Sequence, residues 1–182
     1  MIADKDDSDD ESLFIERPML VTQRLVMRAP RESDIAELVQ LADNRHVAQM
    51  LARMPHPYGE AEARAFIAMC QLRQPGATYA LTLVGQGPEA GAFVGCAGLN
   101  AKDRGLELGY WIGEPYWKHG YATEAAAGLI DCAFGAGAKA VIAHSLAEPN
   151  ASNAVMRKLG LRFCGEVDAD GTAVWRWRLD RP

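Results

Sequence analysis

The stretch LELGYWIGEPYWKHGYATEAAAGLI, residues 106–130, decides the fold of this chain. At its start, apolar side chains occupy every second position, the period of a strand with one buried face: Leu106, Leu108, Tyr110 and Ile112. Pro115 ends that pattern. From Tyr121 onward, apolar side chains recur at helical spacing: Ala125, Ala126, Leu129, Ile130, Ala133 and Phe134. The stretch therefore predicts a strand, a loop that contains glycine, and a helix.

The loop at residues 117–123 predicts an anion site. Gly120 lets consecutive backbone N–H groups point at one place, toward which the positive end of the next helix dipole also points. No Gly-Lys-Ser/Thr follows, so the P-loop pattern is absent, and so is the dinucleotide pattern Gly-x-Gly-x-x-Gly. The alternative is a plain connection in which Gly120 only eases a turn.

A resemblance favours the anion site. ELGYWI followed by YWKHGYATEA resembles the acetyl-CoA pyrophosphate loop of the GNAT superfamily of N-acetyltransferases, in its ribosomal-protein-alanine (RimJ/RimL-like) branch. That loop runs Gln/Arg-x-x-Gly-x-Gly/Ala, which Trp117-x-x-Gly120-x-Ala122 matches except at the first position; Lys118 stands where relatives often have glycine. The resemblance implies that acetyl-CoA is bound by the loop residues Trp117, Lys118, His119, Gly120, Tyr121, Ala122 and Thr123.

The order of the other expected elements agrees with this resemblance. An early strand around residues 20–29 is followed by a helix that begins at Asp34, with Glu37 as its capping-box partner. Arg24 and Arg28 are interpreted as exposed strand charges. Further expected elements are a helix at 59–73, strands at 79–84, 92–99, 140–146, 163–167 and 173–179, and a helix that ends near Gly160. The resemblance implies the α/β fold of the superfamily, with a mixed, mostly antiparallel sheet of six to seven strands and about four flanking helices.

Composition limits the classes of protein that fit. A length of 182 residues, with 49% hydrophobic and 24% charged residues, suits one globular domain. The net charge of −5 is concentrated in the first 16 residues, which carry −6, so residues 1–17 are expected to form an acidic disordered tail and residues 18–182 a single domain. The nearly neutral remainder gives no expectation of nucleic-acid binding. The acidic start is unlike a signal peptide, and no apolar run reaches membrane-spanning length, so a cytoplasmic protein is expected.

Cysteine and histidine spacing predicts no metal site. Four cysteines and four histidines are scattered without the short spacings of zinc ligands or of a disulfide framework. The cysteines Cys70, Cys96, Cys132 and Cys164 are interpreted as buried small hydrophobic residues. An acyl-enzyme route is not indicated either, because no cysteine stands beside a base.

A second segment, EPNASNAVMRKLGL at 148–161, carries polar residues at the start of a helix. Helix capping accounts for Asn150 and Ser152 by itself. By resemblance, Asn153 matches an asparagine that contacts the pantetheine arm, with Asn150 nearby. Many relatives carry a tyrosine in this helix as general acid toward the leaving thiolate; this chain lacks it, and the resemblance offers Ser152 as the substitute.

The remaining catalytic roles follow from the strand before the loop. Glu107 is the candidate general base, acting through water, although a polar residue on the second face of the sheet is an equal reading. Backbone groups around Trp111 and Ile112 would pair with the pantetheine amides and polarise the thioester carbonyl. Transfer is then direct, within a ternary complex of enzyme, acetyl-CoA and amine.

The resemblance predicts an acetyl-CoA-dependent N-acetyltransferase, without a metal, that acts on a protein or peptide N-terminal α-amine. A small-molecule amine remains open as the acceptor, and so does a catalytically silent acyl-CoA-binding module. A purely structural α/β interaction domain is a third reading, which predicts no cofactor binding. The sequence leaves monomer and homodimer open.

Overall fold

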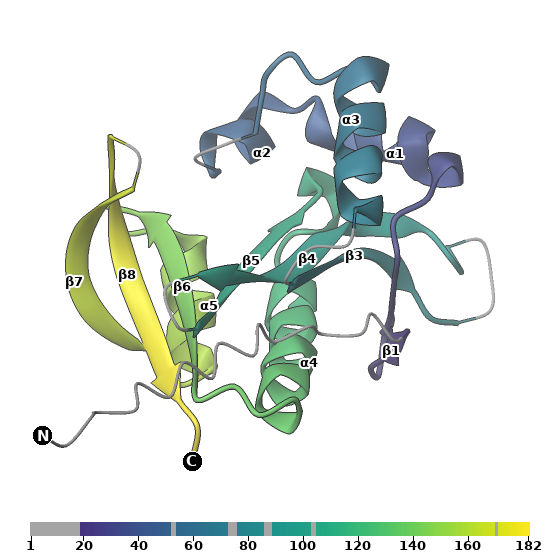
Figure 1. The fold of residues 1–182 in the computed structure, drawn as a ribbon. Coiled ribbons are helices and arrows are strands. Elements are labelled where there is room, and N and C mark those ends of the chain that lie inside the picture. The colour runs from purple at the N-terminus through teal and green to yellow at the C-terminus, as the bar shows by residue number, and fades with distance from the viewer. Residues whose placement is uncertain (1–18, 52–53, 73–75, 86–88, 103–104, 170) are drawn as a thin grey trace, which may run out of the picture.

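The computed structural model describes residues 19–51, 54–72, 76–85, 89–102, 105–169 and 171–182, and Figure 1 shows how their elements are arranged. The strands are β1 (Leu20–Val21), β2 (Leu25–Arg28), β3 (Gly76–Leu83), β4 (Phe93–Lys102), β5 (Gly105–Ile112), β6 (Ala140–Leu146), β7 (Arg162–Ala169) and β8 (Thr172–Asp180). The helices are α1 (Ile35–Ala42), α2 (Arg45–Gln49), α3 (Glu60–Gln71), α4 (Tyr121–Gly135) and α5 (Ala151–Lys158), with short 3-10 helices η1 (Glu32–Asp34) and η2 (Glu114–Tyr116). The acidic tail expected at residues 1–17 lies outside the described residues.

All of these strands belong to one sheet, in the order β1-β2-β3-β4-β5-β6-β8-β7. Neighbouring strands are antiparallel except β5 and β6, which are parallel and joined through α4. The mixed, mostly antiparallel sheet is therefore confirmed. The described residues contain one or two strands and one α-helix more than the sequence predicted. The two-residue β1 and the five-residue α2 are too short to show a period, so the sequence pattern did not separate them from their neighbours.

The helices cover the two faces of the sheet separately, as Figure 1 shows. On one face, α4 and α5 pack against the larger core, to which they contribute Ala125, Leu129 and Met156. On the other face, α1 and α3 pack over a smaller core that contains Leu38, Ile67 and Phe93. Side chains of β5 alternate between these two cores, because successive residues of a strand point to opposite faces. Tyr110 packs against the larger core and Trp111 against the smaller one.

Three local predictions were wrong. The carboxylate of Asp34 does not cap α1; it accepts the backbone N–H of Arg31 at 2.9 Å and forms an ion pair with Arg28 at 2.7 Å. Arg28 is therefore not an exposed strand charge. Cys164 is exposed on β7 and Cys132 is only partly buried, whereas Cys70 and Cys96 are buried as expected. The first two errors have one cause: Asp34 satisfies a neighbouring arginine, which removes its carboxylate from the helix end.

Candidate functional site

The sheet opens between β5 and β6. The two strands pair at only three positions, the last of which joins Leu108 to Ala143. Beyond it, β5 continues to Ile112 and β6 to Leu146 without pairing to each other. A cavity of about 400 Å³ lies at this opening. Its walls come from α2 and the residues after it, the end of β5, the loop before α4, and α5: Val47, Met50, Leu51, Tyr110, Trp111, Ile112, Tyr116, Trp117, Lys118, Gly120, Tyr121, Ala122, Thr123, Ala151, Ser152, Ala154, Val155 and Lys158.

The loop of residues 117–120 leads into α4 with two residues in the left-handed backbone region. Lys118 has φ 64° and Gly120 has φ 83°. Gly120 is the cap residue of α4, and no side chain caps the helix there. The N–H groups of the first helical turn have no acceptor within the helix itself. They stand at the positive end of the dipole of a helix that is 15 residues long. This is the arrangement that binds phosphate oxygens in proteins.

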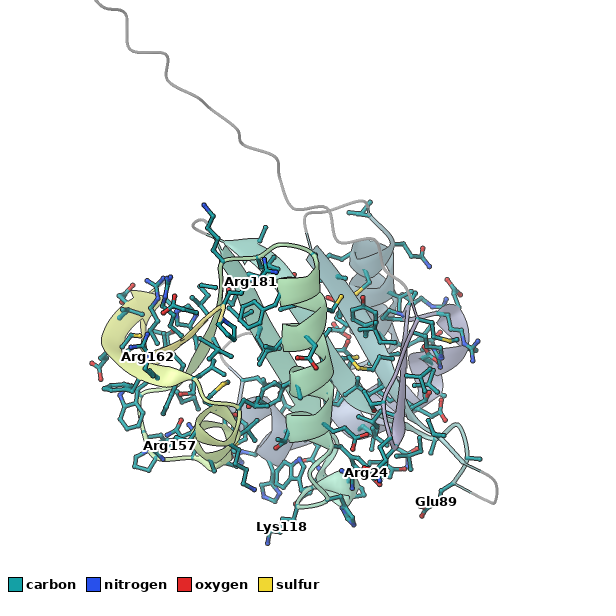
Figure 2. The ribbon with its side chains drawn as sticks, turned by 90° about the horizontal axis from the view of Figure 1, so that it is seen from below. Arg24, Glu89, Lys118, Arg157, Arg162 and Arg181 are labelled. Atoms are coloured by element: carbon teal, nitrogen blue, oxygen red, sulfur yellow. The ribbon has the colours of Figure 1, made fainter. Side chains whose placement is uncertain are left out.

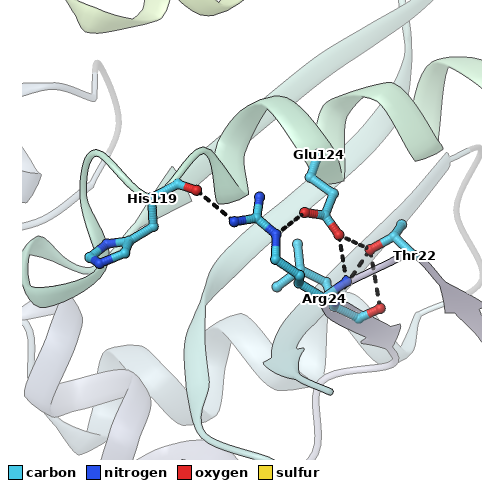
Figure 3. A network of polar contacts seen from close by, with 5 residues as sticks. Thr22, Arg24, His119 and Glu124 are labelled. Carbon is cyan, nitrogen blue, oxygen red and sulfur yellow. Dashed lines mark hydrogen bonds and ion pairs between the residues drawn. The ribbon is translucent and has the colours of Figure 1, made fainter. Parts of the chain in front are cut away.

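A network of polar contacts fixes the loop from outside the cavity (Figure 3). Glu124, in the first turn of α4, accepts hydrogen bonds from the Thr22 hydroxyl at 2.6 Å and from Nε of Arg24 at 2.7 Å. Arg24 also donates to the backbone carbonyl of His119 at 2.9 Å. In a trans peptide the C=O and N–H point in opposite directions. Holding the His119 carbonyl toward Arg24 therefore directs the N–H of Gly120 away from Arg24.

The indole of Trp117 ties the other side of the loop to the strand. Its Nε1–H donates to the carbonyl of Ile112 at 2.7 Å. Trp117 stands where the resembled loop has glutamine or arginine, and here its side chain joins the loop to the end of β5 while it lines the cavity. The loop is thus held at His119 by Arg24 and at Trp117 by β5.

The backbone groups of β5 that face the opening belong to Tyr110 and Ile112. The carbonyl of Trp111 faces β4, because a Cβ added to Gly95 would lie 2.2 Å from that oxygen. Adjacent residues of a strand direct their N–H and C=O groups to opposite edges. The pairing of Trp111 and Ile112 backbone groups with the pantetheine amides stays a prediction. The backbone carbonyl of Trp111 belongs to the β4–β5 ladder, although its side chain lines the cavity.

Glu107 and Ser152 lie on opposite faces of the sheet, and of the two only Ser152 lines the cavity. Glu107 lies four residues before Trp111 on β5, so its side chain is on the same face of the sheet. Its carboxylate lies 2.5 Å from Nδ1 of His144 on β6. Both side chains are partly exposed. Ser152, in the first turn of α5, lines the cavity on the other face. A group placed between β5 and β6 could therefore meet a carboxylate–imidazole pair on one side and a hydroxyl on the other.

The other predicted cofactor residues do not line the cavity. Asn150 caps α5, and its side chain accepts the N–H of Asn153. The side chain of Asn153 is only 2% exposed; it accepts from Ser145 at 2.8 Å and donates to the carbonyl of Glu148 at 3.0 Å. The ring of His119 stacks on Tyr121. Cofactor contact by Asn150, Asn153 and His119 stays a prediction, while the structure shows all three bracing the walls of the site.

Sequence reasoning missed four contributions to the site: His144 beside Glu107, the Tyr110 side chain, Lys158 at the end of α5, and the apolar wall of Val47, Met50 and Leu51. Alternation along the strand showed that the Tyr110 side chain faces the core but not that this residue lines a cavity. Figure 2 shows Arg24 and Lys118 at the same end of α4.

Within the described ranges, His, Cys, Asp and Glu side chains form no group of three that could hold a metal ion. None of the helices there combines the length and apolarity needed to span a bilayer.

Comparison with known proteins identifies the family. A family model described as Acetyltransferase (GNAT) domain matches residues 24–162. The chain belongs to the GNAT acetyltransferase family. As a member of this family it is an acetyl-CoA-dependent N-acetyltransferase. A comparison with curated protein sequences finds no match.

Solved structures share the fold at low sequence identity. A GNAT-family acetyltransferase from Bacillus anthracis has a TM-score of 0.77 and 19% identity, over 90% of this chain and 98% of the other. RimL, a ribosomal L7/L12 α-N-protein acetyltransferase in complex with coenzyme A, has a TM-score of 0.74 and 20% identity, over 89% of this chain and 97% of the other. The microcin C7 self-immunity acetyltransferase MccE, in complex with acetyl-CoA and AMP, has a TM-score of 0.73 and 15% identity, over 88% of this chain and 94% of the other. These similarities show that the chain shares the fold of these proteins over most of its length.

Proposed function

We propose that this GNAT protein transfers the acetyl group of acetyl-CoA to a protein or peptide N-terminal α-amine by direct attack within a ternary complex. One observation carries the proposal. The cavity at the opening between β5 and β6 is lined by residues at the start of α4 and by Ser152, and the Glu107–His144 pair joins the two strands where the opening begins. The structural similarity to RimL, named as an α-N-protein acetyltransferase, supports the same acceptor class.

The loop and α4 would bind the diphosphate of acetyl-CoA. The cavity is lined by Lys118 and by residues 120–123, whose backbone N–H groups would be the donors, and Lys118 and Lys158 add positive charge to its walls. Charge-assisted hydrogen bonds contribute about 1.5–3 kcal/mol each. The backbone groups of Tyr110 and the N–H of Ile112 would then pair with the pantetheine amides and with the thioester carbonyl, since the carbonyl of Ile112 already accepts from Trp117.

The acceptor would enter from the face of Glu107 and His144. An α-amino group with a pKa of about 7.7–8.0 is neutral roughly one time in ten at pH 7, so its deprotonation costs about 1 kcal/mol. A lysine amine at about 10.4 would cost about 4.6 kcal/mol. A carboxylate that acts through water, held in place by the imidazole of His144, is a sufficient base for the α-amine. The side chain of the acceptor would lie on the apolar wall of Val47, Met50 and Leu51.

Thiol release from acetyl-CoA tests this function. The purified protein is challenged with short peptides that have free N-termini, and separately with polyamines, amino acids and aminoglycosides. Release with the peptides alone is the expected result. Release with small amines alone would replace the peptide α-amine by a small-molecule amine as the acceptor. Binding of acetyl-CoA without release by any amine would favour an acyl-CoA-binding module instead.

Glu107→Gln tests the base separately. Loss of the carboxylate is expected to lower kcat by about 100-fold at pH 7, within the range known for general bases, with little change in the Kd of acetyl-CoA. Full turnover near neutral pH would remove Glu107 from this role.

The single sheet of the described residues supports one domain over residues 18–182. Cytoplasmic location and oligomeric state stay predictions.

A further inference from the structure

The hydroxyl of Tyr110 has a place in the site that packing alone does not explain. Tyr110 lies on β5, packs against the larger core and lines the cavity. Its Oη is shielded from solvent and has no hydrogen-bond partner of good geometry among the described residues. A buried hydroxyl without a partner costs about 1–3 kcal/mol, and phenylalanine would fill the same space without that cost. The hydroxyl is therefore expected to have a partner that binds in the cavity.

The surroundings of Tyr110 keep its proton in place. Burial raises the pKa of Tyr110 to about 12, and the Ser152 side chain acts in the opposite direction. The phenol is thus an O–H donor throughout the neutral and mildly alkaline range. Ser152 lies on α5 and lines the same cavity from across the opening.

Acetyl transfer requires a donor at this position. As the amine nitrogen bonds to the carbonyl carbon, the C–S bond breaks and its electron pair passes to sulfur, which then takes a proton. The candidate base Glu107 lies on the face of the sheet that holds Trp111, and Tyr110 lies on the opposite face. A thioester between β5 and β6 would therefore have its nucleophile on the side of Glu107 and could have its leaving group on the side of Tyr110.

We propose that Tyr110 is the general acid of the reaction, donating its hydroxyl proton to the sulfur of coenzyme A as the C–S bond breaks. The proton of the attacking amine leaves through water to Glu107, and the Tyr110 phenolate regains a proton from solvent through the Ser152 hydroxyl. Ser152, which the sequence offered as the acid, becomes the relay. This inference rests on the acetyl transfer proposed above.

Tyr110→Phe tests the kinetic consequence. The variant is expected to lose about 100-fold in kcat, within the range known for general acids, while KM for acetyl-CoA changes less than about twofold. Tyr79→Phe is the matched control, because the Tyr79 hydroxyl is likewise shielded from solvent and belongs to the same core, but Tyr79 does not line the cavity. Wild-type kcat in Tyr110→Phe, or an equal loss in both variants, would overturn the proposal. Ser152→Ala is expected to show a smaller loss than Tyr110→Phe.

A binding comparison tests contact with sulfur directly and needs no acceptor. Calorimetry at pH 9, where an alkyl thiol is partly ionised, compares coenzyme A with desulfo-coenzyme A, which lacks the sulfur. Coenzyme A is expected to bind about 10-fold more tightly to the wild type, and equally with its analogue to Tyr110→Phe. An unchanged ratio in the variant would contradict the contact. If no amine accepts acetyl, the proposed function fails, but this ratio still decides whether Tyr110 meets the sulfur.

Discussion

Two arginines, Arg24 just before β2 and Arg28 at its end, tie this part of the sheet to helical segments on opposite faces, and they do so in different environments. Arg24 pairs with Glu124 of α4, and the side chains are 45% and 15% exposed. Arg28 pairs with Asp34 before α1, and the side chains are 17% and 4% exposed. The first pair holds the loop that lines the cavity, whereas the second lies under a helix that does not line it. The same residue type therefore serves the site in one place and the stability of the fold in the other.

The largest expected effect is on the buried pair. Asp34→Ala leaves the Arg28 guanidinium without its carboxylate and the Arg31 N–H without its acceptor. Breaking a buried pair by removing one partner costs about 3–5 kcal/mol. Urea denaturation is expected to show this loss in the free energy of unfolding. Coenzyme A affinity of the folded protein is expected to stay within about twofold. Glu37→Ala, which removes an exposed carboxylate from α1, is the control. A loss of less than about 1 kcal/mol in the free energy of unfolding would mean that the Arg28–Asp34 pair contributes no more to stability than an exposed pair does.

The pH dependence of stability sharpens the same contrast. Burial alone would raise the pKa of Asp34, but hydrogen bonds from Arg28 and from the Arg31 N–H, together with the charges of both arginines, lower it below its ordinary value. A lowered pKa in the folded state stabilises the fold above the unfolded pKa near 4 and loses that effect as the pH falls through the folded value. The free energy of unfolding is expected to fall with pH below about 5. Asp34→Asn is expected to flatten that slope by up to about 1.4 kcal/mol per pH unit, the effect of one proton. Equal slopes in both proteins would contradict the pairing.

The Arg24–Glu124 pair is expected to act on cofactor binding. Glu124→Gln keeps the shape of the side chain but removes the charge that Arg24 and the Thr22 hydroxyl share. With Arg24 released from the His119 carbonyl, the Gly120 N–H loses its fixed direction. Calorimetry is expected to show about 10-fold weaker coenzyme A binding, equal to about 1.4 kcal/mol, and kcat at saturating acetyl-CoA is expected to change little. Asp131→Asn, an exposed charge on the same helix, is expected to leave affinity unchanged. Equal effects of the two variants would remove the positioning role.

The fold was readable from the sequence where the pattern was local. β5, the loop and α4 follow from a period of two, then Pro115 and Gly120, then a helical period, and the observed ends of β5 and α4 lie within one residue of the prediction at the strand–loop–helix junctions. The partners of Arg24 and Glu107 were not readable, because Glu124 lies 100 residues from the first and His144 lies 37 residues from the second. The role of Tyr110 was hidden for a similar reason. Its alternation indicates burial, but only the three-dimensional opening between β5 and β6 makes Tyr110 part of the cavity wall.

The smallest expected effect concerns the backbone of the loop itself. Lys118 has φ 64°, a region that costs a residue with a side chain about 1–2 kcal/mol and costs glycine almost nothing. Lys118→Gly and Lys118→Ala both remove the ammonium group, but only the glycine variant relieves the backbone. The glycine variant is expected to be more stable than the alanine variant by about 1 kcal/mol, a difference of about 2–4 °C in Tm. Both are expected to lose the same fraction of coenzyme A affinity, because the lost charge is common to them. Equal Tm values would show that Arg24 and Trp117 do not hold Lys118 in this conformation. The loop would then be free to relax, and the contrast between a positioned site and a stabilised fold would lose its structural basis.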